Sequence, residues 1–242
     1  MYHPKLCKEV RKGYYWLSKD FTGIGTTSFR TVEGNGNVTF DQVQATTSKQ
    51  ATTVTNNTTT QFLYSFASDQ KTKTSGSVAA GWTGATYYAT WWRIPLDGLS
   101  NTGITTIFAH NAASPNLRWR FFHTGGVTNT MSLTVSADGT ATQTDIWAGP
   151  TDALYHYLEL IYTPSVGVDF YKDFTLISHS TQAINIASLA NPATPLGIGG
   201  STAAAVNTND HEMGNSYYTN GIPTLKNRKR LAGVSAPKNT RF

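Results

Sequence analysis

The sequence predicts an all-β fold in which the strands form two packed antiparallel sheets. Charged residues make up only 14% of the 242 residues, while aromatic residues reach 12%, so the chain has ample apolar surface to bury. Strand-like runs recur at regular intervals from Val38 onward and are separated by turn residues. Helical periodicity is sparse, which excludes a fold of alternating strands and helices.

The expected elements follow one another in a regular order. Residues 46–60, rich in Thr and Asn, are interpreted as either a polar loop or an exposed edge strand. Apolar and β-branched runs predict about ten strands and a closing one, at residues 38–43, 60–66, 86–94, 104–110, 117–123, 131–136, 154–163, 166–171, 174–178 and 195–199, and near 215–219. We therefore expect a sandwich at residues 38–220, between an N-terminal arm at 1–37 and a basic C-terminal arm at 221–242.

Two of these strands indicate how they are covered. Residues 154–163 (LYHYLELIYT) place apolar side chains on both faces, which is typical of a central strand covered on both sides. In residues 117–123 (LRWRFFH), Arg118, Arg120 and Phe122 share one face, so this half-buried strand has a basic side that could face a ligand. Trp91 and Trp92 are adjacent and must point to opposite faces.

The charge is concentrated at the two ends of the chain. Residues 1–30 hold six Lys or Arg and two acidic residues, and residues 213–242 hold six Lys or Arg and no acidic residue. The whole chain has 19 Lys and Arg and 14 Asp and Glu, so the middle of the chain carries seven basic and twelve acidic residues. Both ends are therefore expected to be basic arms on a mildly acidic body. Cys7 is the only cysteine, which excludes an internal disulfide and a multi-cysteine zinc site.

The run from Thr86 to Gly200 resembles the laminin G-like branch of the concanavalin A-like lectin and glucanase superfamily. The similar elements are TYYATWWRIP at 86–95, MSLTVSADGT at 131–140, Trp147 followed by LYHYLELIYTPSVGVDFYKDFTLIS at 154–178, and PLGIGGS at 195–201. They occur in the family's order and cover about half of the chain. The resemblance implies a jelly-roll sandwich, and Asp138-Gly139 and Lys172-Asp173 suit the tight turns it needs.

The sequence does not favour an enzyme. The superfamily's glucanases are similar in carrying alternating carboxylates on one strand, and retaining hydrolysis needs two of them about 5 Å apart. Residues 154–163 have only Glu159, and Asp210-His211-Glu212 lies in an expected loop. There is no nucleophile-elbow, phosphate-loop or zinc-protease motif. We expect no catalytic residues, no cofactor and no bound metal.

Two kinds of binding residue are candidates. Exposed aromatic side chains stack on sugars, and the glycan-binding candidates are Trp82, Trp119 and Tyr217; for each, packing in the core is the competing interpretation. The partner-anchoring candidates are basic residues of the C-terminal arm, namely Lys226, Arg228, Lys229 and Arg230. Nucleic acid is not an expected partner because the arm lacks interleaved aromatic residues.

These features lead to two functional hypotheses. The leading one is a non-enzymatic structural component of a virus particle, a bacteriophage head-decoration, minor capsid or tail protein whose arms anchor to neighbouring subunits. It is motivated by an exterior-type composition without a secretory signal or a membrane span, and it implies assembly in the host cytoplasm, other virion proteins as partners and a homo-oligomer or larger assembly. The alternative is a glycan-binding lectin module for host recognition, with a cell-surface glycan as ligand.

Overall fold

A computed structural model gives the fold. It describes residues 84–94, 96–100, 102–111, 117–138, 140, 142–180, 195–198 and 211–235, and before residue 84 six strands through their backbone pairing. Within these residues, no helix has the length and apolar character needed to cross a membrane.

In the part of the chain that the structure describes, strands dominate and two helices occur. The strands before residue 84 are β1 Gly13–Trp16, β2 Thr27–Thr31, β3 Asn37–Gln42, β4 Thr52–Thr55, β5 Phe62–Phe66 and β6 Thr72–Ser77. The later strands are β7 Thr86–Arg93, β8 Ile104–Asn111, β9 Leu117–Thr124, β10 Thr130–Val135, β11 Gln143–Ala148, β12 His156–Thr163, β13 Gly167–Lys172, β14 Thr175–Ser180, β15 Pro195–Ile198 and β16 His211–Asn220. The helices are α1 Leu96–Ser100 and α2 Leu225–Ser235.

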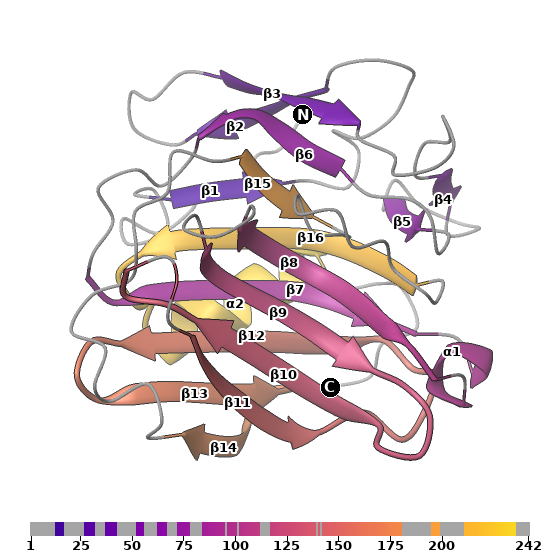
Figure 1. Ribbon diagram of the computed structural model, residues 1–242. Helices are drawn as coiled ribbons and strands as arrows, with labels where there is room; N and C mark the ends of the chain where they lie inside the picture. Colours follow the sequence, from indigo (N-terminus) through magenta and orange to yellow (C-terminus); the bar gives the residue numbers. More distant parts are fainter. Residues whose placement is uncertain are drawn as a thin grey trace.

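The strands fold over into two facing layers (Figure 1). The front layer runs β11-β10-β9-β8-β15, and the back layer runs β16-β7-β12-β13-β14. Strands β6, β3, β2 and β1 join the two layers along one side, so that the hydrogen-bonded path is continuous. The pairings in both layers are antiparallel. The prediction of an all-β antiparallel sandwich is confirmed.

The core lies between the two layers. Alternate residues of β7 and β12 point inward, where Tyr88 and Trp92 are fully buried. They meet aromatic residues of the front layer: the ring of Tyr88 lies 4.0 Å from that of Phe108, and Trp147 stacks on Phe170 at 5.0 Å between ring centroids. These aromatic contacts hold the two layers together.

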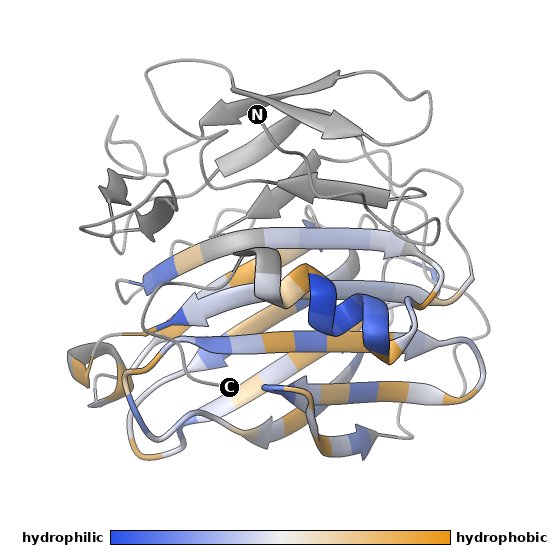
Figure 2. Ribbon diagram, turned by 180° about the vertical axis from the view of Figure 1, so that it is seen from behind, coloured by the Kyte–Doolittle hydropathy of each residue, from blue (hydrophilic) through white to orange (hydrophobic). Residues whose placement is uncertain are grey.

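The outer face of the back layer is covered by α2 (Figure 2). Tyr87, Trp91 and Tyr217 form a second buried cluster there, with Leu231 and Ala232 of the helix. Thr224 begins the helix in the manner of an N-cap, because its hydroxyl accepts from the backbone N–H of Asn227 at 3.4 Å. Strand β12 is buried along almost its whole length, which confirms the prediction of a central strand covered on both sides.

The structure corrects the expected arms in the parts it describes. Residues 13–16 and 27–31 of the expected N-terminal arm form β1 and β2, and β1 pairs with β16 inside the sheet. Residues 225–235 of the expected C-terminal arm form α2, which packs on the chain's own back layer. The sandwich therefore draws on residues from both ends of the chain.

Candidate functional site

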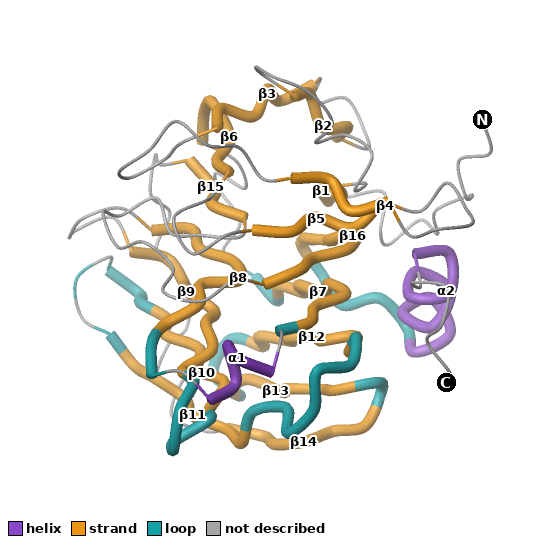
Figure 3. The backbone as a smooth tube through the Cα atoms, turned by 90° about the vertical axis from the view of Figure 1, so that its right-hand side faces the viewer, coloured by secondary structure: helices purple, strands orange, loops and turns teal. Residues whose placement is uncertain are grey.

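Loops from both layers meet at one end of the sandwich, which Figure 3 shows facing the viewer. We call this end the rim. It comprises Arg93 at the end of β7, the turn at residues 125–129, the loop at 149–155, the turn at 173–174 and Glu212 near the start of β16. Sheet register places these segments together, because Trp92 is opposite His156 and Arg93 is opposite Glu212.

Asn129 ties the turn at 125–129 to the loop at 149–155. Its side-chain Nδ2 donates to the carbonyl oxygen of Pro150 at 2.7 Å, and its own carbonyl accepts from the N–H of Gly149 at 2.8 Å. Its Oδ1 lies 2.8 Å from Nε2 of His123, so this histidine nitrogen carries the proton. Burial lowers the pKa of His123, which keeps the ring neutral.

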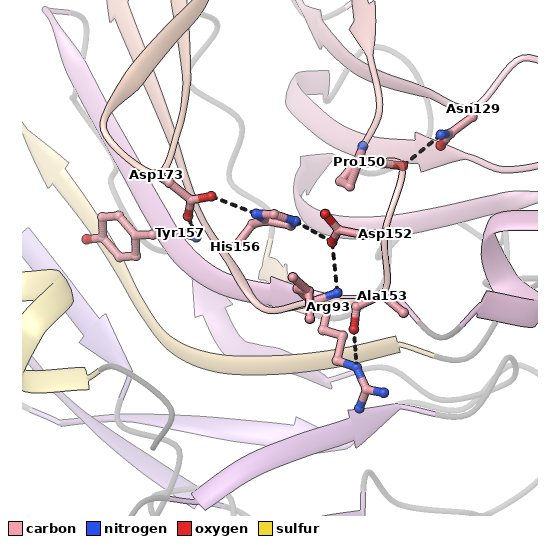
Figure 4. A network of polar contacts seen from close by, with 9 residues as sticks. Arg93, Asn129, Pro150, Asp152, Ala153, His156, Tyr157 and Asp173 are labelled. Carbon is pink, nitrogen blue, oxygen red and sulfur yellow. Dashed lines mark hydrogen bonds and ion pairs between the residues drawn. The ribbon is translucent and has the colours of Figure 1, made fainter. Parts of the chain in front are cut away.

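A histidine between two carboxylates forms the centre of the rim (Figure 4). Nε2 of His156 donates to Oδ1 of Asp152 at 2.8 Å, and Nδ1 donates to Oδ2 of Asp173 at 2.7 Å. The side chain of His156 is only 7% exposed, but those of Asp152 and Asp173 are 44% and 39% exposed. The imidazole is thus a buried support that holds two carboxylates at the surface.

Electrostatics favour the charged forms of His156 and Asp152. Burial opposes a charged His156, but hydrogen bonds and charges from Asp173 and Asp152 outweigh it and raise the pKa of the imidazole. Burial likewise opposes ionisation of Asp152, but the N–H of Leu154 and the side chain of His156 lower the pKa of the carboxyl. Asp152 is therefore ionised down to more acidic pH than an ordinary aspartate.

A second cluster lies beside the first. Arg93 donates from Nε to the carbonyl oxygen of Ala153 at 2.7 Å and forms an ion pair with Glu212, whose Oε2 is 3.0 Å from a terminal guanidinium nitrogen. The Tyr155 hydroxyl donates to the same oxygen of Glu212, and its ring lies 5.5 Å from the guanidinium carbon. Burial opposes the charge on Arg93, but Glu212 outweighs it and raises the pKa of the guanidinium.

The rim offers hydrogen-bond acceptors, a donor and apolar contacts to solvent at one place. Arg93 keeps 34% of its side chain exposed. Two large apolar side chains of the rim are also exposed, Val127 at 107% and Leu154 at 65%, as is Leu96 of α1 at 69%. Fixed carboxylates accept hydrogen bonds from hydroxyl groups, while Tyr155 and the apolar residues suit the C–H faces of a ring. This combination suits a hydroxyl-rich ligand such as a sugar. Among the described residues, no group of three or more His, Cys, Asp or Glu side chains is arranged so that it could hold a metal ion.

Two of the three glycan-binding candidates from the sequence, Trp119 and Tyr217, do not lie at the rim. Trp119 is fully buried between the layers, where its ring lies 5.5 Å from that of Tyr218. Tyr217 is 1% exposed beneath α2, and its hydroxyl donates to the carbonyl oxygen of Leu231. Both candidates are corrected, because a buried ring cannot stack on a sugar. Trp82 lies outside the described residues.

The four partner-anchoring candidates all lie on α2. Arg228 is corrected, because its side chain is only 9% exposed and forms an ion pair with the buried Glu159 of the same chain. Lys229 lies over the ring of Phe174 at 5.8 Å. Lys226 and Arg230 are exposed on the helix, and their anchoring role remains a prediction.

The rim network was not among the sequence candidates. Its members come from five separate segments, so that only the register of β7, β12, β13 and β16 brings them together. A local signal did exist, since Asp152 and His156 are four residues apart at the start of a strand. Of the sequence-adjacent trio Asp210, His211 and Glu212, only Glu212 is a member of the rim: Asp210 lies outside the described residues, and His211 is fully buried.

Comparisons with known proteins support the fold. No family model matches the chain, and no curated protein matches its sequence. Solved structures do match. The receptor-binding domain of botulinum neurotoxin mosaic serotype C/D has a TM-score of 0.66 at 7% identity, over 94% of this chain and 52% of that one.

Two further structures give the same result. One is a structure of botulinum neurotoxin type C, whose cell entry depends on interaction with two ganglioside molecules. It has a TM-score of 0.64 at 10% identity, over 95% of this chain and 53% of that one. The other, a serotype D ligand-binding domain in complex with N-acetylneuraminic acid, has a TM-score of 0.58 at 9% identity, over 90% and 52%. The chain spans about half the length of these structures. At such identities the likeness shows the fold alone, a lectin-like β-sandwich.

Proposed function

We propose that this chain is a non-enzymatic recognition domain that binds a glycan through the rim. One observation supports this most directly: two exposed carboxylates, Asp152 and Asp173, are held in place by a buried His156 that bonds to both. A site whose polar groups are already fixed loses little conformational entropy when a ligand binds.

The chemistry of the rim matches a sugar. Of the hydrogen bonds among the described residues, those of Asp152 use Oδ1, so that Oδ2 can accept from a sugar hydroxyl. Carboxylate acceptors form charge-assisted hydrogen bonds with hydroxyl groups, which are stronger than neutral ones. Tyr155 and Leu154 lie beside Asp152 in the same loop and provide surface for the apolar face of a sugar ring.

The structural neighbours are consistent with this proposal. Cell entry of botulinum neurotoxin type C depends on interaction with two ganglioside molecules, and the serotype D domain is in complex with N-acetylneuraminic acid. Since this chain covers only about half of those chains, the proposal depends on the rim rather than on the neighbours. The assignment of this chain to the concanavalin A-like superfamily, in its laminin G-like branch, is part of the same proposal.

The charge state of Asp152 supports a binding rather than a catalytic role. A general acid at neutral pH needs a raised pKa, whereas the pKa of Asp152 is lowered. Burial does raise the pKa of Glu159, but this residue is 0% exposed beneath α2, where a polysaccharide cannot reach it.

A structural role in a virus particle has less support than glycan recognition. In that hypothesis, residues 221–242 anchor the chain to neighbouring subunits. Residues 225–235 instead pack on the chain's own sheet, and Arg228 is used internally. A bacteriophage context for a glycan-binding domain is compatible with the proposal, and mass spectrometry of purified particles would test it.

A glycan array with matched variants tests the proposal. We expect the parent chain to bind a defined set of glycans and Asp152→Asn to weaken that binding roughly 10-fold or more, because a charge-assisted hydrogen bond is lost. Asp169→Asn is the control, since Asp169 bonds to His179 at 2.5 Å on strands β13 and β14, away from the rim. Thermal melts would establish that both variants fold. If the parent binds no glycan, or if the two variants bind alike, the rim is not a glycan site.

A further inference from the structure

The outer face of the front layer carries a second set of solvent-directed side chains. Strand β9 alternates, so that Trp119 and Phe121 enter the core while Arg120 and Phe122 lie half-buried on the opposite face. Sheet register places Thr134 of β10 opposite Arg120, and Thr144 of β11 opposite Thr134. We call this set, together with Thr106 of β8, which is only 1% exposed, the Arg120 face. The predicted face of this strand is confirmed for Arg120 and Phe122, while the side chain of Arg118 lies outside the described residues.

The guanidinium of Arg120 is fixed by its neighbours. Its Nε and one terminal nitrogen donate to the hydroxyl of Thr106 at 3.2 and 2.8 Å. Its central carbon lies 4.7 Å from the centroid of the Phe122 ring, a cation–π contact. The hydroxyl of Thr106 therefore orients the planar fork, and three of its five N–H groups take no part in these bonds.

Arg120 has no compensating charge within the described part of the chain. None of the ion pairs among these residues includes it, and burial, the single cause of its shift, lowers the pKa of the guanidinium. Arginine stays charged under these conditions, and a partly desolvated charge without a partner is costly. A ligand anion would relieve that cost and would meet donors that are already oriented.

The surroundings indicate the kind of anion. The hydroxyls of Thr134 and Thr144 lie 3.0 Å apart and can both donate and accept. The half-buried Phe122 ring adds an aromatic edge, and Ile146 of β11 is 64% exposed on the same face, opposite Ser132. A free inorganic ion uses the fork alone, whereas a sugar acid also uses the hydroxyls and the apolar surface.

We propose that the Arg120 face binds the carboxylate of an acidic saccharide, with Arg120 as the recognition residue. Planar guanidinium groups recognise carboxylates in a bidentate manner. The Arg120 face lies on the outside of the front layer and is separate from the rim, which is formed by the loops at the sandwich end (Figures 1 and 3). The choice of a saccharide depends on the proposed function, but the oriented fork does not.

Calorimetric titration of the full chain with tri-galacturonate tests this inference. Its methyl ester is the matched ligand, since it has the same sugars without the charges. We expect the ester to bind at least roughly 10-fold more weakly than tri-galacturonate. The substitution Arg120→Gln should lower the affinity for tri-galacturonate by a similar factor. Arg230→Gln makes the same charge change on the exposed side of α2 and should leave the affinity unchanged. Added salt should weaken the binding.

Three results would overturn the inference: no binding of tri-galacturonate, equal binding of acid and ester, or equal affinity of parent and Arg120→Gln. Sodium acetate, added as a competitor, separates the anion from the saccharide. If acetate displaces tri-galacturonate at equal concentration, the site recognises a bare anion and the saccharide assignment is wrong. A failure of the glycan array at the rim is a different result, because it leaves the acid–ester comparison intact.

Discussion

The contact between α2 and the back layer gives the most informative stability prediction. Arg228 lies with one terminal nitrogen 3.4 Å from Oε1 of Glu159 and with its guanidinium carbon 4.7 Å from the Tyr171 ring centroid. Glu159 is 0% exposed and accepts one further hydrogen bond, from the hydroxyl of Tyr87 at 2.9 Å. Arg228→Met keeps an apolar chain of similar length but removes the positive charge.

The expected cost follows from the charge that is left behind. Breaking a buried ion pair costs roughly 3–5 kcal/mol because the remaining charge is uncompensated. The 3.4 Å separation is long for a charge-assisted hydrogen bond, so we expect about 3 kcal/mol. For a chain of this size, that lowers Tm by roughly 6–12 °C. Arg230→Met, an exposed change on the same helix, should stay within about 0.5 kcal/mol.

The dependence on pH provides the sharper test. Burial raises the pKa of Glu159, although Arg228 and Tyr87 partly offset it. Because the pKa of Glu159 is raised in the folded state, folding favours its protonated form. The stability that this protonation contributes is fully present at a pH below the pKa of the unfolded state, and it is lost as the pH rises through the pKa of the folded state. Without Arg228 the folded pKa rises further. The stability difference between parent and Arg228→Met should therefore be small near pH 4 and grow towards neutral pH.

Urea unfolding followed by tryptophan fluorescence measures these differences. Adding Glu159→Gln to Arg228→Met should recover stability at neutral pH, because it removes the uncompensated charge. If Arg228→Met and Arg230→Met unfold alike at neutral pH, or if the double variant is no more stable than Arg228→Met, the ion pair does not hold α2.

Three further predictions concern the core and the rim. Trp147→Ala should cost about 3–5 kcal/mol, as for other large-to-small core changes, and coincident melts of variant and parent would contradict its core position. Burial opposes a charged His156, but its two carboxylate partners raise the pKa of the imidazole. The contribution of His156 to stability, measured against His156→Gln, is complete below pH about 6.5 and should fall as pH rises through the raised pKa. A pH-independent stability difference between parent and variant would refute this. Gly149→Ala should lower Tm because a Cβ would lie 2.5 Å from Oδ1 of Asn129. Gly233 lies in a helix with open space around it, so Gly233→Ala should add about 0.5–1 kcal/mol to the stability of the fold. Equal melts of the two variants would show that the close approach at Gly149 is not maintained.

The fold was predictable because it depends on local patterns. Alternation at residues 117–123 and 154–163 identified β9 and β12 together with the faces they present. The adjacent pair Trp91 and Trp92 was expected on opposite faces, and one ring lies beneath α2 while the other lies in the core. Strand β11 at residues 143–148 was missed, since QTDIWA has only two large apolar residues and one of them, Ile146, is exposed.

The rim could not be predicted in the same way, because it is a product of strand register. Glu212 and Arg93 are 119 residues apart in sequence and become neighbours only through the pairing of β16 with β7. The aromatic candidates failed for a related reason: Trp119 has the composition of a sugar-stacking residue, but the alternation of β9 turns it inward. A residue type identifies a candidate, and its face in the sheet decides its role.

Helix α2 covers an apolar sheet face that the sequence predicts to be covered, although the sequence does not indicate which segment covers it. Residues 154–163 have apolar side chains on both faces, which requires a cover on the outer face of the back layer. The segment that supplies the cover, Leu225–Ser235, has three adjacent basic residues and weak amphipathic character, so composition assigned it to an arm. Its contact depends on Arg228, which meets a buried Glu159, and on Leu231 and Ala232, which meet aromatic rings. A basic run is therefore a surface feature only when the opposing layer carries no buried acid, and in this chain Glu159 was the residue that could have indicated the docking.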